Sequence, residues 1–401
     1  MNKKKGIIMK DTRTGFEKFM VWFGLGALMF GTYCGANMAS GAYAANYMVT
    51  KGGGHMWLLI GMFVVLMAFF CGAALDFIRV YNTRDYNSFY MSLWGLRDED
   101  GNLKGNSALR MIVTVFYDFY STVIGVVTVA ATMSLFASLL NSLWGIPTLI
   151  GSLVSLLLFA VLSMYGAAFL RRFNTAMTIA LAVSLVAILA LVIGLKGDVL
   201  SERLTSLTIG SDWGSRTVKE HYWFVFLYCG ICCSWGGPLS NYCDRIKTKS
   251  DAWCSGIFIG VMIGLVFLLT SLIVLPYMPD VATENAPILA ICTNYLPKIM
   301  TAIYWAVVMF SVVSTGPTFI FNTSNRFIKV WKNDNVPQRL KLFIIAMAFL
   351  LLCLLLSFVG LIAICQVWYK WLGTLGIYFM GIPIIYSLYR VWKKDKEAAG
   401  K

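Results

Sequence analysis

Long apolar runs recur along the whole chain, and they limit the folds that it can adopt. Runs of roughly 20 or more mostly apolar residues are long enough to cross about 30 Å of hydrocarbon. Only 13% of the 401 residues are charged, against about 25% in soluble domains. Because the backbone must satisfy its own hydrogen bonds inside a bilayer, the spanning segments are expected to be helices. The sequence therefore predicts an all-α polytopic membrane protein that is embedded in the lipid bilayer.

We expect ten transmembrane helices. They cover residues 16–49, 53–80, 108–141, 146–169, 173–195, 219–243, 251–276, 297–330, 340–359 and 361–389. An even number of spans puts both termini on one side, and most of the 33 Lys and Arg residues fall in the segments on that side. The positive-inside rule makes this side the cytoplasm. The net charge of +14 therefore reflects membrane topology rather than nucleic-acid binding, and we expect a multi-pass protein of the cell (inner) membrane.

The ten spans divide into two halves of five. We predict a cytoplasmic N-terminus over 1–15, a first five-helix repeat over 16–195, an extracellular loop over 196–218, a second five-helix repeat over 219–389 and a cytoplasmic tail over 390–401. An odd number of spans in each half gives the two repeats inverted topology. Short helices outside the spans are expected near Tyr86 to Trp94 and from Pro287.

The first span is polar and rich in glycine at mid-depth. It contains Gly31, Gly35 and Gly41, together with Asn37 and other small polar residues. Glycine weakens a helix and lets a ligand approach the backbone. A helix that unwinds here would offer carbonyl groups to a cation and amide groups to an anion. Close packing against another helix is the alternative, since Gly31 and Gly35 have the small-xxx-small spacing.

The sixth span contains a strong helix breaker at mid-depth. Gly236 and Gly237 precede Pro238, which has no N–H to donate and clashes with the preceding turn. A simple kink is the alternative. However, broken helices at corresponding positions of two inverted repeats are typical of a transporter binding site. The nearby Cys229, Cys232, Cys233 and Cys243 do not have the spacing of a closed zinc site.

The eighth span carries three hydroxyl side chains on one helix face. Ser311, Ser314 and Thr315 precede Gly316 and Pro317, and positions i, i+3 and i+4 are neighbours on a helix surface. Hard cations prefer oxygen ligands, so these hydroxyls are a candidate sodium site. The alternative is that they bond back to their own helix.

Charged residues inside the spans are scarce, and each one is a candidate functional group. Asp118 lies about ten residues into the third span, where it could pair with a cationic group of a substrate, carry a proton or form a structural hydrogen bond. Asp76 lies near the cytoplasmic end of the second span and close to Arg79. No nucleophile and base are paired in the sequence, so we do not expect an enzyme, and no cofactor is expected.

These features resemble the amino acid–polyamine–organocation superfamily, which has the leucine-transporter fold, and within it a bacterial branch. The likeness covers about residues 20–330. It rests on Gly31-x-x-x-Gly35-Ala-Asn37 in the first span, on Lys51 and the three glycines that follow it, with Asp76 in the second span, and on Ser311-x-x-Ser314-Thr315 in the eighth. The Arg–aromatic outer gate of the sodium symporters is not evident after the first break.

The resemblance implies two sites. The sodium ion would be bound by the carbonyl groups of Gly31 and Cys34, by Ser311 and by the hydroxyls of Ser314 and Thr315. The substrate would lie between the two breaks. The contacts that the resemblance implies are Tyr33, Cys34, Asn37, Tyr117, Tyr120, Cys233, Ser234 and Trp235. To these candidates we add Gly35 and Gly236 at the breaks, and Asp118.

The sequence thus predicts a secondary active transporter that couples sodium to a small zwitterionic or cationic solute, such as an amino acid or an amine, by alternating access. Spans 1, 2, 6 and 7 would move as a bundle against a scaffold of spans 3, 4, 8 and 9. Proton coupling through Asp118 or Asp76 is an alternative. A channel or sensor on the same fold is another, and the oligomeric state is left open.

Overall fold

The structure is a computed structural model that describes residues 13–164, 167–205, 217–233, 239–328, 331 and 336–399. Within these ranges the regular secondary structure is helical, apart from an isolated β-bridge between Arg97 and Leu103. The α-helices are α1 (Gly15–Tyr33), α2 (Ala36–Ala39), α3 (Gly53–Tyr81), α4 (Tyr86–Leu93), α5 (Ser107–Trp144), α6 (Thr148–Ser163), α7 (Ala167–Thr205), α8 (Val218–Cys232), α9 (Lys249–Val274), α10 (Pro287–Tyr295), α11 (Lys298–Ile328), α12 (Gln338–Ser357), α13 (Leu361–Ala363), α14 (Tyr369–Gly376) and α15 (Ile382–Ala399).

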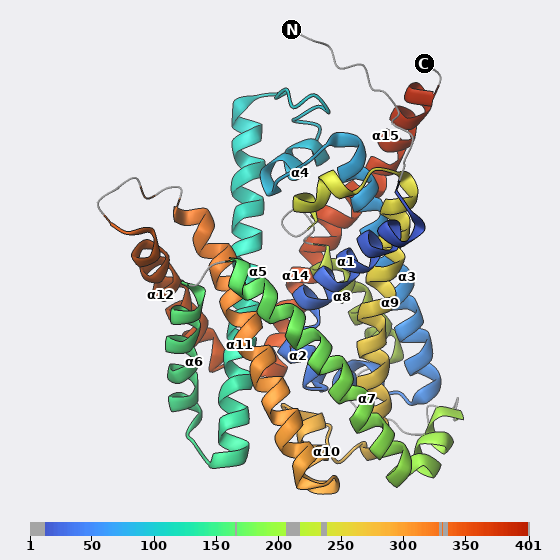
Figure 1. Cartoon of the computed structure of the whole chain (residues 1–401), viewed down its shortest axis with the longest axis vertical. Helices are drawn as coiled ribbons and strands as arrows, with labels where there is room; N and C mark the ends of the chain where they lie inside the picture. Colours follow the sequence, from blue (N-terminus) through green and yellow to red (C-terminus); the bar gives the residue numbers. More distant parts are fainter. Residues whose placement is uncertain are drawn as a thin grey trace.

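Seven helices within the described ranges are long and apolar enough to cross a membrane. The remaining three of the ten predicted spans correspond to α1, α6 and α8, which are 19, 16 and 15 residues long. Two of these three, α1 and α8, are the helices in which breaks were predicted. Figure 1 shows the long helices running side by side, with α5, α6 and α12 on one side of the molecule and α3, α7 and α9 on the other.

Several boundaries differ from the prediction. Helix α6 ends at Ser163 and α7 begins at Ala167, so the fourth span is shorter and the fifth starts earlier than expected. Helix α7 continues to Thr205, with a kink at Lys196, into the segment predicted to be a loop. The side chain of Arg203 explains this extension, because it donates hydrogen bonds to the carbonyl groups of Leu275 (2.6 Å) and Met278 (2.9 Å).

Two groups of helices pack through small residues. In the first, α9 lies against α3: a Cβ added to Gly256 would meet the backbone nitrogen of Gly72 at 2.5 Å, and one added to Gly260 would meet the carbonyl oxygen of Val64 at 2.6 Å. In the second, α5, α6, α11 and α12 pack on one another. Small residues are typical of helix contacts in membranes, since they let backbones approach closely. The two groups agree with the predicted bundle and scaffold.

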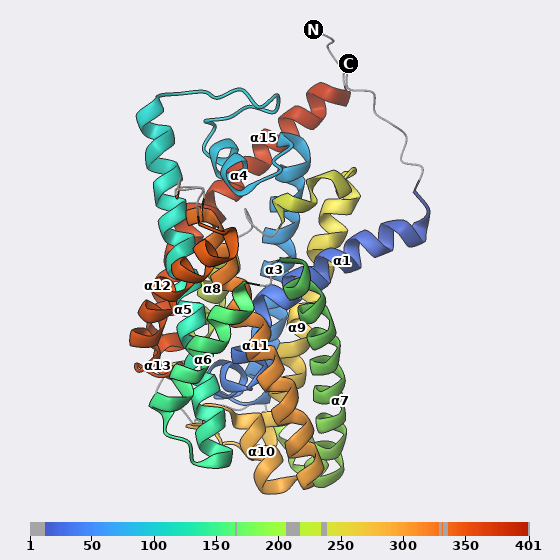
Figure 2. The same ribbon diagram turned by 60° about the vertical axis from the view of Figure 1, so that its left-hand side comes forward.

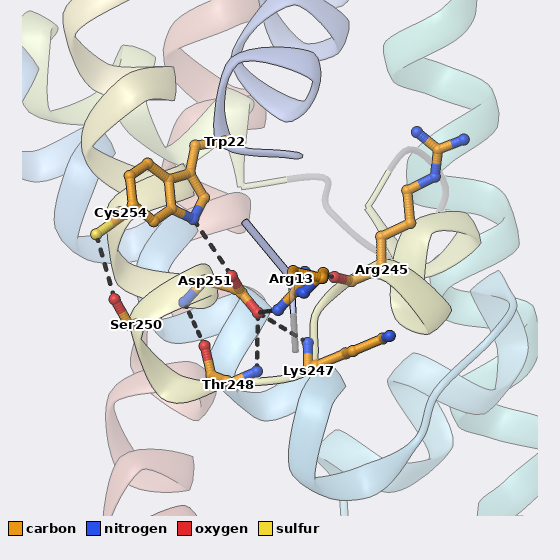
Figure 3. A network of polar contacts seen from close by, with 8 residues as sticks. All are labelled: Arg13, Trp22, Arg245, Lys247, Thr248, Ser250, Asp251 and Cys254. Atoms are coloured by element: carbon orange, nitrogen blue, oxygen red, sulfur yellow. Dashed lines mark hydrogen bonds and ion pairs between the residues drawn. The ribbon is translucent and has the colours of Figure 1, made fainter. Parts of the chain in front are cut away.

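A polar network at the start of α9 holds the first helix of the bundle. Figure 3 shows the carboxylate of Asp251 accepting hydrogen bonds from the backbone amides of Lys247 (3.1 Å) and Thr248 (2.9 Å). The Arg13 guanidinium pairs with the same carboxylate at 2.5 Å, and the indole N–H of Trp22 approaches it at 3.4 Å. These contacts tie the N-terminal half of α1 to α9, and Figure 2 shows α1 leaving the body of the molecule obliquely at this end.

Candidate functional site

The first predicted break is present. Helix α1 ends at Tyr33, and Cys34 leaves the helical conformation with φ −89° and ψ 42°. The Cys34 amide still donates to the carbonyl of Phe30 at 2.7 Å. Helix α2 begins at Ala36 and lasts four residues, and Gly41 follows it with φ +83°, a conformation that glycine adopts without strain. The unwinding predicted for the first span is therefore confirmed around Cys34 and Gly35.

The break lies directly against α11. A Cβ added to Gly35 would lie 2.9 Å from Oγ1 and 3.0 Å from Cγ2 of Thr315. Thr315 and Ser311, one turn apart on α11, are both buried. The structure thus brings together the first break and the face of α11 that was predicted to bind sodium. Gly31 stands in the last turn of α1 and Asn37 in α2, while the side chains of Asn37 and Ser314 lie outside the described part of the structure.

The second break is seen on one side. Helix α8 ends at Cys232, the Cys233 amide donates to the carbonyl of Gly230 at 3.2 Å, and helical structure resumes as a 3₁₀ turn over Ser240–Arg245. Ser234, Trp235 and Gly236, which were predicted to bind substrate, lie outside the described residues.

The end of α8 is fixed by close contact with α14. A Cβ added to Gly373 would lie 2.1 Å from the carbonyl oxygen of Leu227, and one added to Gly376 would lie 2.1 Å from that of Gly230. These two glycines let the backbones touch, so the position at which α8 stops is set by its partner helix.

Five buried cysteines gather between the two breaks. The buried thiols of Cys34, Cys71, Cys229 and Cys233 lie in the neighbourhood of the buried Cys232 thiol, and we call these five the thiol cluster. They come from the first break, from α3 and from the end of α8. Among the described residues no three His, Cys, Asp or Glu side chains are grouped as for a metal ion.

Two predicted aromatic contacts lie at this cluster. The Tyr33 hydroxyl is within electrostatic range of Cys232, Cys71, Cys233 and Tyr120. Tyr120 projects from α5, and its hydroxyl donates to the carbonyl of Leu372 at 2.9 Å. The structure thus brings Tyr33, Cys34, Tyr120 and Cys233 together from three different helices.

Tyr117 lies in a different environment from Tyr120, although the two share a face of α5. Its ring stacks on Tyr90 of α4 with centroids 3.7 Å apart. Its hydroxyl accepts from the indole N–H of Trp94 at 2.6 Å and donates to the carbonyl of Phe379. The structure therefore places Tyr117 in a layer of aromatic side chains beside α4 rather than in the thiol cluster.

A second layer of aromatic side chains lies along α8. Tyr43 lies against Tyr228 and Tyr369, with ring centroids 5.2 and 6.3 Å away, and Tyr47 stacks on Phe224 at 3.5 Å. All five rings are buried or nearly so. Tyr43 directly precedes the π-helical turn Ala44–Met48, which carries Tyr47, and α8 and α14 contribute the other three rings.

The expected short helix α10 packs on the end of the first broken helix. The amide of Ile288 donates to the carbonyl of Ser40 at 3.1 Å, and its side chain occupies the space beside Gly41. The hydroxyl of Tyr304 donates to the carbonyl of Ala39. These contacts hold the end of the first broken helix under α10.

The two candidate acids do not meet at the cluster. Asp76 is buried near the end of α3, where its carboxylate accepts from the Arg79 guanidinium at 2.8 Å and from the indole N–H of Trp253 at 3.3 Å. Asp118 is half-buried on α5, next to Phe119, whose ring is 68% exposed. Asp76 is therefore engaged by two side chains at the end of α3.

Two residues of this region were not predicted. Cys71 lies between Phe70 and Gly72 on α3, where its sequence surroundings are those of an ordinary apolar span. Tyr90 lies on α4 within electrostatic range of Tyr33 and Tyr120. The aromatic anchors expected between Tyr86 and Trp94 were the signal available for Tyr90, but they were assigned to the membrane interface.

No protein-family model matches the chain, and no curated protein matches it in sequence. Solved structures do match. A manganese transporter of Eremococcus coleocola has a TM-score of 0.58 at 11% identity, over 98% of this chain and 94% of that one. MhsT in complex with L-phenylalanine has a TM-score of 0.56 at 12% identity, over 94% and 98%. A Na⁺-coupled sialic acid symporter in a substrate-bound outward-open state has a TM-score of 0.51 at 15% identity, over 92% and 86%.

These structures share the leucine-transporter fold. At such low identity the likeness shows the fold, and the fold is the one that the sequence resemblance implied. The chain is therefore an all-α membrane protein with the leucine-transporter fold, in which the first helix is broken.

Proposed function

We propose that this chain is a secondary active transporter that binds its solute between the two helix breaks and couples its movement to sodium. The observation that carries the proposal is the convergence at one place of Gly35, Thr315 and the thiol cluster. An unwound segment leaves backbone groups available for a ligand, and partial charges at helix ends attract ions. Solved structures of the same fold include a Na⁺-coupled symporter.

The sodium site that we propose uses the carbonyl groups of Gly31 and Cys34 with the hydroxyls of Ser311, Ser314 and Thr315. Its support is the contact between the break and Thr315, because a cation bound there would touch both elements. In that position sodium would hold α2 against α11. Its binding would then stabilise one arrangement of the bundle and scaffold over another, which coupling requires.

The solute that we propose is a small amino acid or amine. Neither 30–43 nor 229–243, which contain the two breaks, includes a charged residue. Charged groups of a solute would therefore be met by backbone dipoles, by the coupling ion and by aromatic rings. Tyr33, Tyr120 and Trp235 could face an ammonium group by cation–π contact. One structure of this fold holds L-phenylalanine.

Proton coupling through Asp76 is disfavoured by its partners, since its carboxylate is already engaged by Arg79 at 2.7 Å and by the indole N–H of Trp253 at 3.3 Å. Asp118 remains the alternative carrier. Its position on α5, one residue from Tyr117, is close to the aromatic side chains but outside the thiol cluster.

Uptake into proteoliposomes tests the proposal. The purified chain is reconstituted, and a panel of labelled amino acids and amines is offered under an inward sodium gradient and under a matched potassium gradient. We expect saturable, concentrative uptake of a solute with sodium alone. Uptake that follows a pH gradient and ignores sodium would move the coupling to Asp118, and uptake that never exceeds the outside concentration would indicate a channel.

A further inference from the structure

Helix α4 packs on α5, the helix that carries Tyr120. It lies at the end of the molecule where α15 also ends (Figure 1). Six of its residues, from Ser88 to Leu93, are buried, although α4 is only eight residues long and lies outside the long helices. Its Tyr90 stacks on Tyr117, which lies one turn from Tyr120 on α5. Helix α4 is thus joined, through α5, to the side chains at the thiol cluster.

Aromatic contacts join α4 to the scaffold. We define the gate layer as Tyr86, Tyr90, Trp94 and Tyr117. The Tyr90 ring stacks on Tyr117, the Trp94 indole donates to the Tyr117 hydroxyl, and the Tyr86 hydroxyl donates to the backbone carbonyl of Tyr117. The Tyr90 hydroxyl reaches Sδ of Met380, which is 3.5 Å away in the π-helical turn Ile377–Gly381. The gate layer thus consists of ring stacking and side-chain hydrogen bonds around one short helix. Contacts of this kind break and re-form without unfolding the helix.

The guanidinium of Arg390 binds the C-terminal turn of α4. Arg390 of α15 donates through one guanidinium nitrogen to the carbonyl of Leu93 (3.0 Å) and through the other to that of Ser92 (3.1 Å). The same guanidinium lies 4.8 Å from the ring centre of Tyr81, the last residue of α3. Carbonyl groups in the last turn of a helix lack partners within the helix and carry partial negative charge. The Ser92 carbonyl also accepts from the backbone amide of Gly95 at 3.0 Å, so Arg390 adds a second hydrogen bond there, a bond to the Leu93 carbonyl and a positive charge beside the turn.

Neighbouring ion pairs fix α15 itself. Lys394 pairs with Glu99, in the loop after α4, at 2.6 Å, and Asp395 pairs with Arg79 of α3 at 2.7 Å. Because α15 is anchored on α3 as well as on α4, Arg390 occupies the junction between a helix of the bundle and the gate layer. A movement of α3 relative to α15 would therefore change the geometry of the two hydrogen bonds that Arg390 donates to α4.

We propose that α4 is the gate on this side of the thiol cluster and that Arg390 is the positioning residue that latches it shut. The proposal takes from the proposed function only the idea that the cluster is the solute site. The planar guanidinium can reach two carbonyl groups together, whereas a lysine ammonium is a single point charge. Opening requires the loss of both hydrogen bonds and of the Tyr90–Tyr117 stack, so the gate should open rarely while Arg390 is in place.

The buried thiols of the chain provide a direct measurement. The detergent-purified protein is exposed to a water-soluble maleimide, and the labelling rate of each cysteine is followed by mass spectrometry. Cys34, Cys232 and Cys233 report on the cluster, while Cys292 of α10 and Cys353 of α12 are equally buried thiols far from α4. Labelling of a buried thiol follows the population of the open state when closing is fast.

We expect Arg390→Ala to speed labelling of the cluster thiols by roughly 10-fold to 100-fold, the factor typical of losing hydrogen bonds to a charged group. Cys292 and Cys353 should keep their rates. Arg390→Lys should give an intermediate rate. The matched control is Lys393→Ala, which removes an exposed positive charge from the same helix and should leave every rate unchanged.

Two results would overturn the proposal. One is equal acceleration of all five thiols, which would show that Arg390 only stabilises the fold. The other is cluster labelling as slow in Arg390→Ala as in the parent protein. If Arg390→Ala does not fold, Trp94→Phe replaces it, since the Trp94 side chain is 45% exposed and the change removes its hydrogen bond to Tyr117 while an aromatic ring remains. The same selective acceleration is expected. These rates need no solute, so failure of the latch is distinct from failure of sodium-coupled uptake.

Discussion

Gly35 and Thr315 touch across the first helix break, so that a Cβ on the glycine would lie 2.9 Å from the threonine hydroxyl oxygen. The contact joins the unwound part of the first span to α11. Both partners belong to the proposed sodium and solute sites, and a Cβ on Gly35 could be accommodated only if the Thr315 side chain or the backbone shifted. Function should therefore be sensitive to a single added methyl group at this point.

Gly35→Ala should abolish sodium-dependent uptake or reduce it at least about tenfold, because the new methyl group would occupy the place of the Thr315 side chain. Overpacking of this kind costs about 1–3 kcal/mol, and here it would separate the break from α11. The matched control is Gly61→Ala on α3, where an added Cβ meets nothing within 4 Å. Equal uptake by the two variants would contradict the proposed contact.

Thr315→Ala should raise the sodium concentration for half-maximal uptake by about tenfold, since a charged ligand loses an oxygen donor. Thr315→Ser keeps the hydroxyl and should remain within about twofold of the parent. Ser311→Ala should act in the same direction as Thr315→Ala. The measurement is the initial uptake rate over a range of sodium at fixed ionic strength. A Thr315→Ala variant with unchanged sodium dependence would remove α11 from the ion site.

Gly373→Ala should destabilise the protein strongly, by about 3 kcal/mol or more, because the methyl group would lie 2.1 Å from the carbonyl oxygen of Leu227 and backbone cannot yield as a side chain can. Gly194→Ala on α7 has open space around it and should be neutral or slightly stabilising. Thermal unfolding in detergent compares them. Similar midpoints would show that α8 and α14 are not in direct backbone contact.

Asp76→Asn should lower stability by about 1–3 kcal/mol, since Arg79 loses its bonds to the buried carboxylate and keeps its pair with Asp395. The sodium dependence and the pH dependence of uptake should keep their shape, because Asp76 lies away from the thiol cluster. The test is uptake at several pH values, normalised to the amount of folded protein. A pH profile that flattens in this variant would return Asp76 to a role in proton coupling.

Local signals predicted the parts of the fold that local chemistry determines. The glycines around Cys34 predicted the first break, and Pro287 predicted the start of α10. The aromatic run after Asp85 predicted α4. Each feature depends on the backbone preferences of a few neighbouring residues, and these are visible in a sequence.

Contacts between distant segments account for what the sequence did not reveal. Helix α7 reaches Thr205 because Arg203 binds carbonyl groups more than 70 residues away. Cys71 joins the thiol cluster because α3 packs beside α8, and nothing near Cys71 in the sequence signals this. Tyr117 and Tyr120 share a helix face, yet one meets α4 and the other meets α14. Such contacts follow from tertiary packing, which the residue pattern of a single sequence does not reveal.

The measurement that tests the central claim most directly is the thermal unfolding midpoint of the purified protein in sodium and in potassium, across a panel of amino acids and amines. A ligand that binds only the folded state raises the midpoint by mass action. We predict that one solute raises it in sodium, and that the rise disappears in potassium and in Thr315→Ala. A solute that raises the midpoint equally in sodium and potassium would contradict sodium coupling at this site.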